Sequence, residues 1–299
     1  MAELTASSAS AAQVAPPLEK SEGYWRSVWR RLRRDRVAMT AGTVLVLILL
    51  ISVFATFLAP ANPYERDVIN RLAAIGTPGS PLGTDELGRD MLSRLIWGGQ
   101  LSLLMGVVPV FIAFFIGSAL GIVAGYAGGL TNTLIMRTVD VFYAFPSVLL
   151  AVALSGALGA GLFNAMFSLT VVFIPPIARV AESVTTQLKS SDFIEAAKAS
   201  GASALTILRV HVLGNVLGPI FVYATSLIAV SMILAAGLSF LGLGVQPPFP
   251  EWGQMLNALR NAIYVQPLVT ALPGVMIFMV SISFNLLSDG LRSAMEVRA

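Results

Sequence analysis

The chain has 299 residues, of which 56% are hydrophobic and 12% are charged, whereas a soluble domain carries about 25% charged residues. With a mean hydropathy of +0.79, this composition excludes an ordinary cytosolic or secreted protein and indicates a membrane protein. The chain has no cysteine and one histidine, His211, which excludes disulfides, thiol catalysis and a multi-histidine metal site. The net charge of +3 does not indicate nucleic-acid binding, because most of the excess lies in one short segment.

That basic segment precedes the first apolar run. Residues 1–23 are rich in Ala, Ser and Pro, a composition that favours disorder. Residues 24–36 carry six arginines, and Trp25, Trp29 and Leu32 share one face if the stretch is helical. We therefore expect an amphipathic helix on the cytoplasmic leaflet, with membrane lipid as its partner. A disordered, positively charged anchor is the alternative.

Six stretches are apolar and close to the roughly 20 residues that a transmembrane helix needs. They are residues 37–58, 101–124, 141–159, 163–177, 212–243 and 267–288, and none contains Asp, Glu, Lys, Arg or His. The fourth stretch is short and contains Pro175-Pro176, which predicts an irregular end. The expected fold is therefore an all-α polytopic membrane protein with six transmembrane helices.

The distribution of Lys and Arg between the loops predicts the orientation of these helices. If the N-terminus is cytoplasmic, the inside segments hold 14 of the 19 basic residues and the outside loops hold 5. We therefore expect both termini in the cytoplasm. The expected organisation is a cytoplasmic tail at 1–36, a first transmembrane helix with an external loop at 37–100, a transmembrane domain at 101–289 and a tail at 290–299.

The chain has no energy source of its own that the sequence reveals. None of its three lysines follows a glycine, so the phosphate-binding loop of ATPases is absent. The expected spans contain no carboxylate or histidine for a proton relay. A sodium-coupled carrier or a channel remains the alternative to a subunit driven by a partner, and an intramembrane enzyme lacks a recognisable site.

The expected cytoplasmic segment 190–210 has the pattern of a short helix, a glycine bend and a second helix. Asp192 is a suitable N-cap, and Glu195 falls in the first turn. Gly201 suits a left-handed C-terminal position, and Ser203 is able to cap the second helix. The first helix is expected to have a narrow surface, because Ala196, Ala197 and Ala199 have small side chains. Such a helix fits a groove on a partner; an ordinary surface helix–turn–helix is the alternative.

The expected external loop contains three carboxylates, Asp85, Glu86 and Asp90, interleaved with Arg89 and Arg94. Their spacing differs from that of the calcium-binding D-x-[DN]-x-[DN]-G loop. We therefore expect the charges to pair with one another and cap the loop, rather than to bind calcium.

Several motifs resemble those of one transporter family. Glu195-Ala196-Ala197, followed after three residues by Gly201 and after nine more by His211-Val212-Leu213, resembles the coupling motif of permease subunits of ATP-binding-cassette (ABC) importers. Further stretches resemble the C-type permease of the dipeptide/oligopeptide/nickel branch: 82–94, 144–146, 238–248, 251–253 and 284–292. Gly214 departs from the usual proline, and Gln100 departs from a common arginine.

The resemblance implies a type I ABC importer permease fold in the bacterial cytoplasmic (inner) membrane, without enzymatic activity or a cofactor in this chain. It implies a second permease, two cytoplasmic subunits that bind ATP and Mg, and an external solute-binding protein as partners. The residues implied to couple to the ATPase are Asp192, Glu195, Ala196, Ala197 and Gly201, and those placed in the external loop are Asp85, Arg89 and Asp90. The implied cargo is a dipeptide, an oligopeptide, glutathione, a D-dipeptide or nickel.

Overall fold

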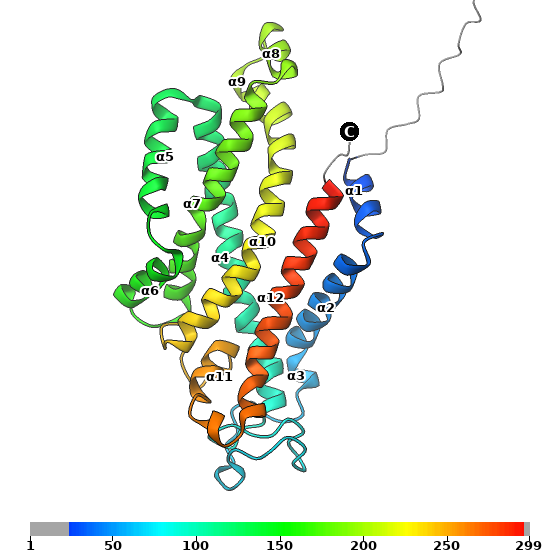
Figure 1. Cartoon of the computed structure of the whole chain (residues 1–299), viewed down its shortest axis with the longest axis vertical. Helices are drawn as coiled ribbons and strands as arrows, with labels where there is room; N and C mark the ends of the chain where they lie inside the picture. The colour runs from blue at the N-terminus through cyan, green and yellow to red at the C-terminus, as the bar shows by residue number, and fades with distance from the viewer. Residues whose placement is uncertain (1–23, 296–299) are drawn as a thin grey trace, which may run out of the picture.

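A computed structural model describes residues 24–295, which fold as a bundle of helices without a β-sheet (Figure 1). Five helical segments in this part of the chain are long and apolar enough to cross a membrane. Four are single helices, α2 (Arg36–Val53), α4 (Met91–Ala127), α7 (Leu162–Lys189) and α12 (Pro267–Met295), and the fifth, Ala204–Phe240, ends in α10 (Leu213–Phe240). A sixth, broken span is formed by α5 (Gly129–Tyr143) and α6 (Ser147–Leu158), which meet at 85°. The prediction of an all-α polytopic protein is therefore confirmed.

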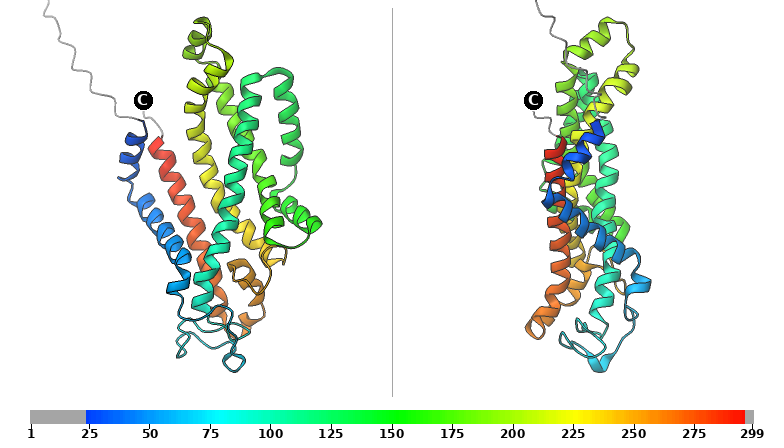
Figure 2. Two further views of the ribbon diagram at one scale, coloured as in Figure 1. Left: turned by 180° about the vertical axis from the view of Figure 1, so that it is seen from behind. Right: turned by 90° about the vertical axis from the view of Figure 1, so that its right-hand side faces the viewer.

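Shorter elements lie at the two ends of the bundle. They are α1 (Tyr24–Leu32), α3 (Ala55–Leu58), the 3₁₀ turns η1 (Val68–Asn70) and η3 (Ala262–Tyr264), α8 (Asp192–Ala199), α9 (Ala204–Thr206), the π-helical segment η2 (Ile207–Val212) and α11 (Trp252–Ala258). Helix α8 lies at one end, called here the α8 end, and the loop 59–90 lies at the other (Figure 1). Helix α1 and the last turns of α12 lie toward the α8 end in each view of the bundle (Figures 1 and 2).

Helices α4 and α7 pack at backbone distance along a row of glycines. Gly117, Gly121 and Gly125 repeat every four residues on α4, so they share one face. A Cβ atom at these positions would lie 2.9, 2.2 and 2.8 Å from the carbonyl oxygens of Ile174, Ala178 and Glu182 in that order. Small residues permit this close approach of two helices in lipid.

This packing corrects the prediction for the fourth span. Helix α7 does not become irregular at Pro175-Pro176 but continues to Lys189. Pro175 is buried, and the glycine face of α4 contacts α7 on both sides of the two prolines. Contact with a neighbouring helix thus stabilises a stretch that the missing proline N–H groups would otherwise weaken.

The third span is also corrected. The predicted continuous helix over 141–159 is wrong, because the chain bends between α5 and α6 at Ala144-Phe145-Pro146. Proline disfavours a helical conformation in the residue before it, which places the break at this point. Helix α5 begins at Gly129, so residues expected in a cytoplasmic loop are helical. The second span likewise starts earlier than 101, at Met91.

The expected amphipathic helix at the N-terminus is present as α1, but its buried face differs from the predicted one. Val28 and Leu32, each 6% exposed, pack with Ala38 and Ala294. Trp29 is half exposed, and the Arg33 guanidinium lies 5.1 Å from the centre of its ring. The expectations for residues 1–23 and for the side chain of Trp25 lie outside the described residues. The buried face of α1 therefore packs against α2 and α12.

Candidate functional site

Helix α8 follows α7 after a two-residue turn. Its N-cap is Ser191, not Asp192 as predicted, and Asp192 is the first helical residue. The shift has a simple cause: α7 extends to Lys189, which leaves only Ser190 and Ser191 for the turn. Asp192 and Glu195 both lie in the first turn, where a negative charge complements the helix dipole.

The C-terminal end of α8 forms a Schellman motif. Gly201 has a φ of +82°, which confirms the predicted left-handed conformation. The Ala202 N–H donates to the Ala197 carbonyl at 3.1 Å, and the Gly201 N–H donates to that of Lys198 at 3.0 Å. Ser203 then caps the next turn, as predicted, because its Oγ accepts a hydrogen bond from the Thr206 N–H at 3.2 Å.

Side chains of α8 divide into an anchoring face and an outer face. Ile194 is fully buried in the main core, and Ala197 packs against the same core. Glu195 and Ala196 are exposed, as is Phe193, whose side chain is 45% exposed. The helix therefore presents Phe193, Glu195 and Ala196 outward, whereas Ala197 faces the bundle.

Phe193 is absent from the predicted set of contact residues. Its ring centre lies 6.2 Å from that of His211, so it connects α8 to η2. An exposed phenylalanine between two acidic residues of one helical turn was a signal available in the sequence.

At the opposite end, the predicted pairing of charges is confirmed for Asp85 with Arg89 and Arg94. Asp85 Oδ2 accepts from Arg89 Nε at 2.6 Å and lies 3.3 Å from Arg94 Nε. Asp85 Oδ1 accepts from the backbone N–H groups of Leu87 and Arg89. The three charged side chains are at most 6% exposed. Asp90 caps α4, with Oδ2 2.7 Å from both the N and the Oγ of Ser93.

Within 24–295 no three His, Asp or Glu side chains converge as a metal site. Both oxygens of Asp85 are occupied, Oδ2 by the two arginines and Oδ1 by two backbone N–H groups, and the cluster holds the loop against the start of α4.

Asp85→Asn is expected to destabilise this end of the protein by about 3–5 kcal/mol, because it leaves buried Arg89 and Arg94 without their counter-charge. Thermal unfolding and the rate of protease cleavage within 59–90 measure the effect. Glu86→Gln is the matched control, since Glu86 is partly exposed and expected to change stability by less than about 0.5 kcal/mol. Equal stability of the two variants would contradict the structural role of Asp85.

Glu251 is another buried carboxylate, and the sequence analysis did not include it among the site residues. It is 1% exposed and caps α11: Oε1 accepts from the Gly253 N–H and from Ser102 Oγ of α4, and Oε2 accepts from the Gln254 N–H. Burial raises the pKa of this carboxyl, while the two backbone hydrogen bonds act in the opposite direction. Glu251 thereby ties α11 to α4.

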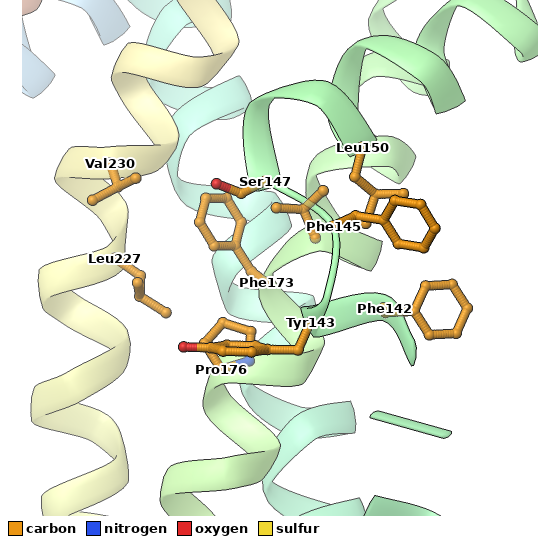
Figure 3. A pocket seen from close by; sticks show the side chains of 10 residues that line it. Phe142, Tyr143, Phe145, Ser147, Leu150, Phe173, Pro176, Leu227 and Val230 are labelled. Carbon is orange, nitrogen blue, oxygen red and sulfur yellow. The ribbon is translucent and has the colours of Figure 1, made fainter. Parts of the chain in front are cut away.

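A pocket of about 300 Å³ lies where the α5–α6 break faces α7 and α10. The rings of Tyr143 and Phe173 lie on the side that faces Leu227 and Val230 of α10 (Figure 3), and Phe145 also lines the pocket. The pocket is large enough for a small solute, and aromatic side chains from the broken span line it.

A bundle of apolar spans, with an anchored helix projecting at one end and a pocket at a broken span, defines a helical membrane-transport subunit. The chain belongs to the family of binding-protein-dependent transport system inner membrane components, whose model matches residues 117–298. Residues 23–74 match the N-terminal transmembrane domain of oligopeptide transport permease C. The protein is therefore a multi-pass inner-membrane permease subunit of an ABC importer and is not itself catalytic.

Curated relatives extend this match over almost the whole chain. The glutathione transport system permease protein GsiD of Escherichia coli O6:K15:H31 is 43% identical over 292 residues, covering 96% of this chain and 95% of that protein. GsiD of Pectobacterium atrosepticum is 40% identical over 272 residues, covering 91% and 90%. An inward-facing MetNI methionine ABC transporter structure has the same fold, with a TM-score of 0.57 and 23% identity over 68% of this chain and 97% of that one.

Family membership decides between the two open classes of transporter. An importer permease works with an ATPase and a substrate-binding protein, so a sodium-coupled carrier or a channel is no longer the alternative.

Proposed function

We propose that the chain forms half of the translocation path of a peptide importer. A second permease supplies the other half, two cytoplasmic subunits bind and hydrolyse ATP with Mg, and an external solute-binding protein delivers the cargo. The observation that carries the mechanism is α8: a helix anchored by Ile194 and closed by Gly201, with Phe193, Glu195 and Ala196 exposed.

The proposed mechanism follows from this geometry. An ATPase subunit binds the outer face of α8, and closure of the ATPase pair moves α8 as a rigid piece. Because Ile194 is embedded in the core that also contains residues of α7 and α10, the movement passes directly to these helices. Rigid-body motion of packed helices is a general route for such coupling.

The proposed orientation places the α8 end in the cytoplasm. The excess of basic residues in the segments assigned to the inside supports it, and the arginine-rich α1 lies toward the same end (Figure 1). Both termini are then cytoplasmic, and loops 59–90 and 241–251 face the binding protein.

For the cargo we propose small peptides, with glutathione as the first to test. The glutathione transport systems of the relatives in Escherichia coli and Pectobacterium support this choice. Dipeptides, longer oligopeptides, D-dipeptides and nickel are the cargoes against which it is compared.

The test is reconstitution of the complete complex in proteoliposomes with ATP inside and the binding protein outside. Labelled glutathione is expected to accumulate only when ATP and the binding protein are both present, and not with a hydrolysis-deficient ATPase subunit. Uptake that needs no ATPase would refute the coupling, and uptake of nickel but no peptide would refute the cargo.

Topology is tested in intact cells, since the chain contains no cysteine. An impermeant thiol reagent is expected to label Glu65→Cys and not Ser203→Cys, both at exposed positions. The reverse pattern would invert the proposed orientation.

A further inference from the structure

Two charged side chains lie inside α5 and α7, at positions that the sequence analysis left outside the expected spans. Asp140 of α5 and Arg179 of α7 form an ion pair, and their side chains are 42% and 48% exposed. Arg179 is ten residues from the end of α7 at Lys189, a distance of about 15 Å along the helix. Asp140 directly precedes the apolar stretch 141–159 and Arg179 follows the stretch 163–177 by two residues, so the pair lies where these apolar stretches end.

Charged residues beside an apolar stretch face water or another polar group, because lipid solvates them poorly. The surroundings of this pair fit a path. The Arg179 guanidinium lies 5.0 Å from the centre of the Tyr143 ring. Tyr143 lines the 300 Å³ pocket, and so does Pro176, one turn before Arg179 (Figure 3). The ion pair therefore adjoins the aromatic pocket through Tyr143.

The neighbouring carboxylate of Glu182 on α7 does not line the pocket. Glu182 lies one turn beyond Arg179, and its Oε1 accepts from Asn132 Nδ2 at 2.8 Å and from Thr186 Oγ1 at 3.1 Å. Its hydrogen bonds stay within the α5–α7 contact, away from the residues that line the pocket. Glu182 therefore supplies a control of the same charge type as Asp140, on the same helix as Arg179.

We propose that Asp140, Arg179 and Tyr143 form a transit site for the charged ends of a small peptide, an assignment that rests on the proposed function. Arg179 binds the cargo carboxylate, Asp140 binds the ammonium group, and the aromatic pocket holds the uncharged part between them. Without cargo, Asp140 and Arg179 pair with each other. A bound zwitterion replaces this one ion pair by two, one between Arg179 and the cargo carboxylate and one between Asp140 and the cargo ammonium group.

This exchange makes the contact weak, which suits transport. A site that bound the cargo tightly would retain it, whereas conduction requires that the solute both enters and leaves. The two protein charges keep a partner in both states, so neither the empty nor the loaded state carries an unpaired ion.

The competing interpretation is a structural brace between α5 and α7. The two interpretations predict different results for a charge swap, Asp140→Arg with Arg179→Asp. The swap restores a brace but reverses the charges that the protein offers to the cargo. The swap, Arg179→Gln, Asp140→Asn and the control Glu182→Gln are compared in the reconstituted complex, together with subunit retention and ATP hydrolysis.

We expect Arg179→Gln, Asp140→Asn and the swap to lower peptide uptake by at least about tenfold, as for a lost charge-assisted hydrogen bond. Glu182→Gln should keep uptake within about twofold. A direct readout uses p-benzoylphenylalanine in place of Phe145 in the pocket, with exposed Phe278 of α12 as the control position. Labelled peptide should crosslink during turnover from position 145 only, and Arg179→Gln should remove the crosslink.

Recovery of wild-type uptake in the charge swap would show that the pair is a brace and overturn the proposal. So would a wild-type complex that imports peptide without a crosslink from position 145. A wild-type complex that imports no peptide refutes the proposed function itself, and is recognised before any variant is compared.

Discussion

Gly201→Val is expected to lower cargo uptake by at least about tenfold while the chain still inserts and assembles. Gly201 has a φ of +82°, and a side chain in the left-handed region costs about 1–2 kcal/mol, with β-branched residues the least suited. A Cβ there meets nothing within 4 Å, so the effect comes from backbone strain alone. Relief of the strain breaks the bond from Ala202 to Ala197 and changes the angle at which α8 leaves the bundle.

Gly201→Asn is the matched control, because asparagine tolerates the left-handed conformation and adds a side chain of similar size. Uptake, ATP hydrolysis and retention of the ATPase subunits are measured in one preparation. We expect the asparagine variant to stay within about threefold of wild type, because asparagine is the residue that most often replaces glycine at this position of a helix end. If the valine variant also transports normally, α8 is an ordinary surface helix and the coupling role fails.

Gly121→Ala is expected to destabilise the packing of α4 against α7. The new Cβ would lie 2.2 Å from the Ala178 carbonyl oxygen and 2.6 Å from the Ala181 Cβ. Neither neighbour is the flexible end of a side chain, so α4 and α7 must separate. Overpacking of this kind costs about 1–3 kcal/mol or more, although alanine is the better helix former.

Gly156→Ala is the control, since this glycine lies within α6 and a Cβ atom added to it would meet nothing within 4 Å. The midpoint of thermal unfolding of the purified complex and the yield of monodisperse protein measure both variants. We expect both values to fall for Gly121→Ala and to stay unchanged or rise for Gly156→Ala. Equal midpoints would mean that α4 and α7 do not depend on backbone contact.

Hydropathy predicted the class of fold because each span needs about 20 apolar residues whatever its neighbours are. It predicted the ends of the spans poorly, since helices continue beyond the apolar core of the membrane. Met91 and Lys189 mark such ends. The helical path through Pro175-Pro176 depends on the glycines of another helix, a long-range contact that no local pattern contains.

The coupling segment was predictable for a related reason. The conformations of Gly201 and Ser203 are determined by a few neighbouring residues, so capping rules apply directly. The Asp140–Arg179 pair was not predictable, because both residues were assigned to positions outside the spans. Only the tertiary packing of α5 against α7 brings them together.

The direction in which α8 leaves the bundle depends on how many residues the π-helical segment η2 contains, more than on which residues they are. Its i→i+5 bonding holds more residues per turn than an α-helix does. Loss of one residue between Ser203 and Leu213 would let the segment close as a regular α-helix and rotate everything before it by about 100°. The face with Phe193 and Glu195 would then point to a different side of the bundle. We therefore expect this stretch to tolerate substitution at its exposed positions, such as Arg209, but not a change in length.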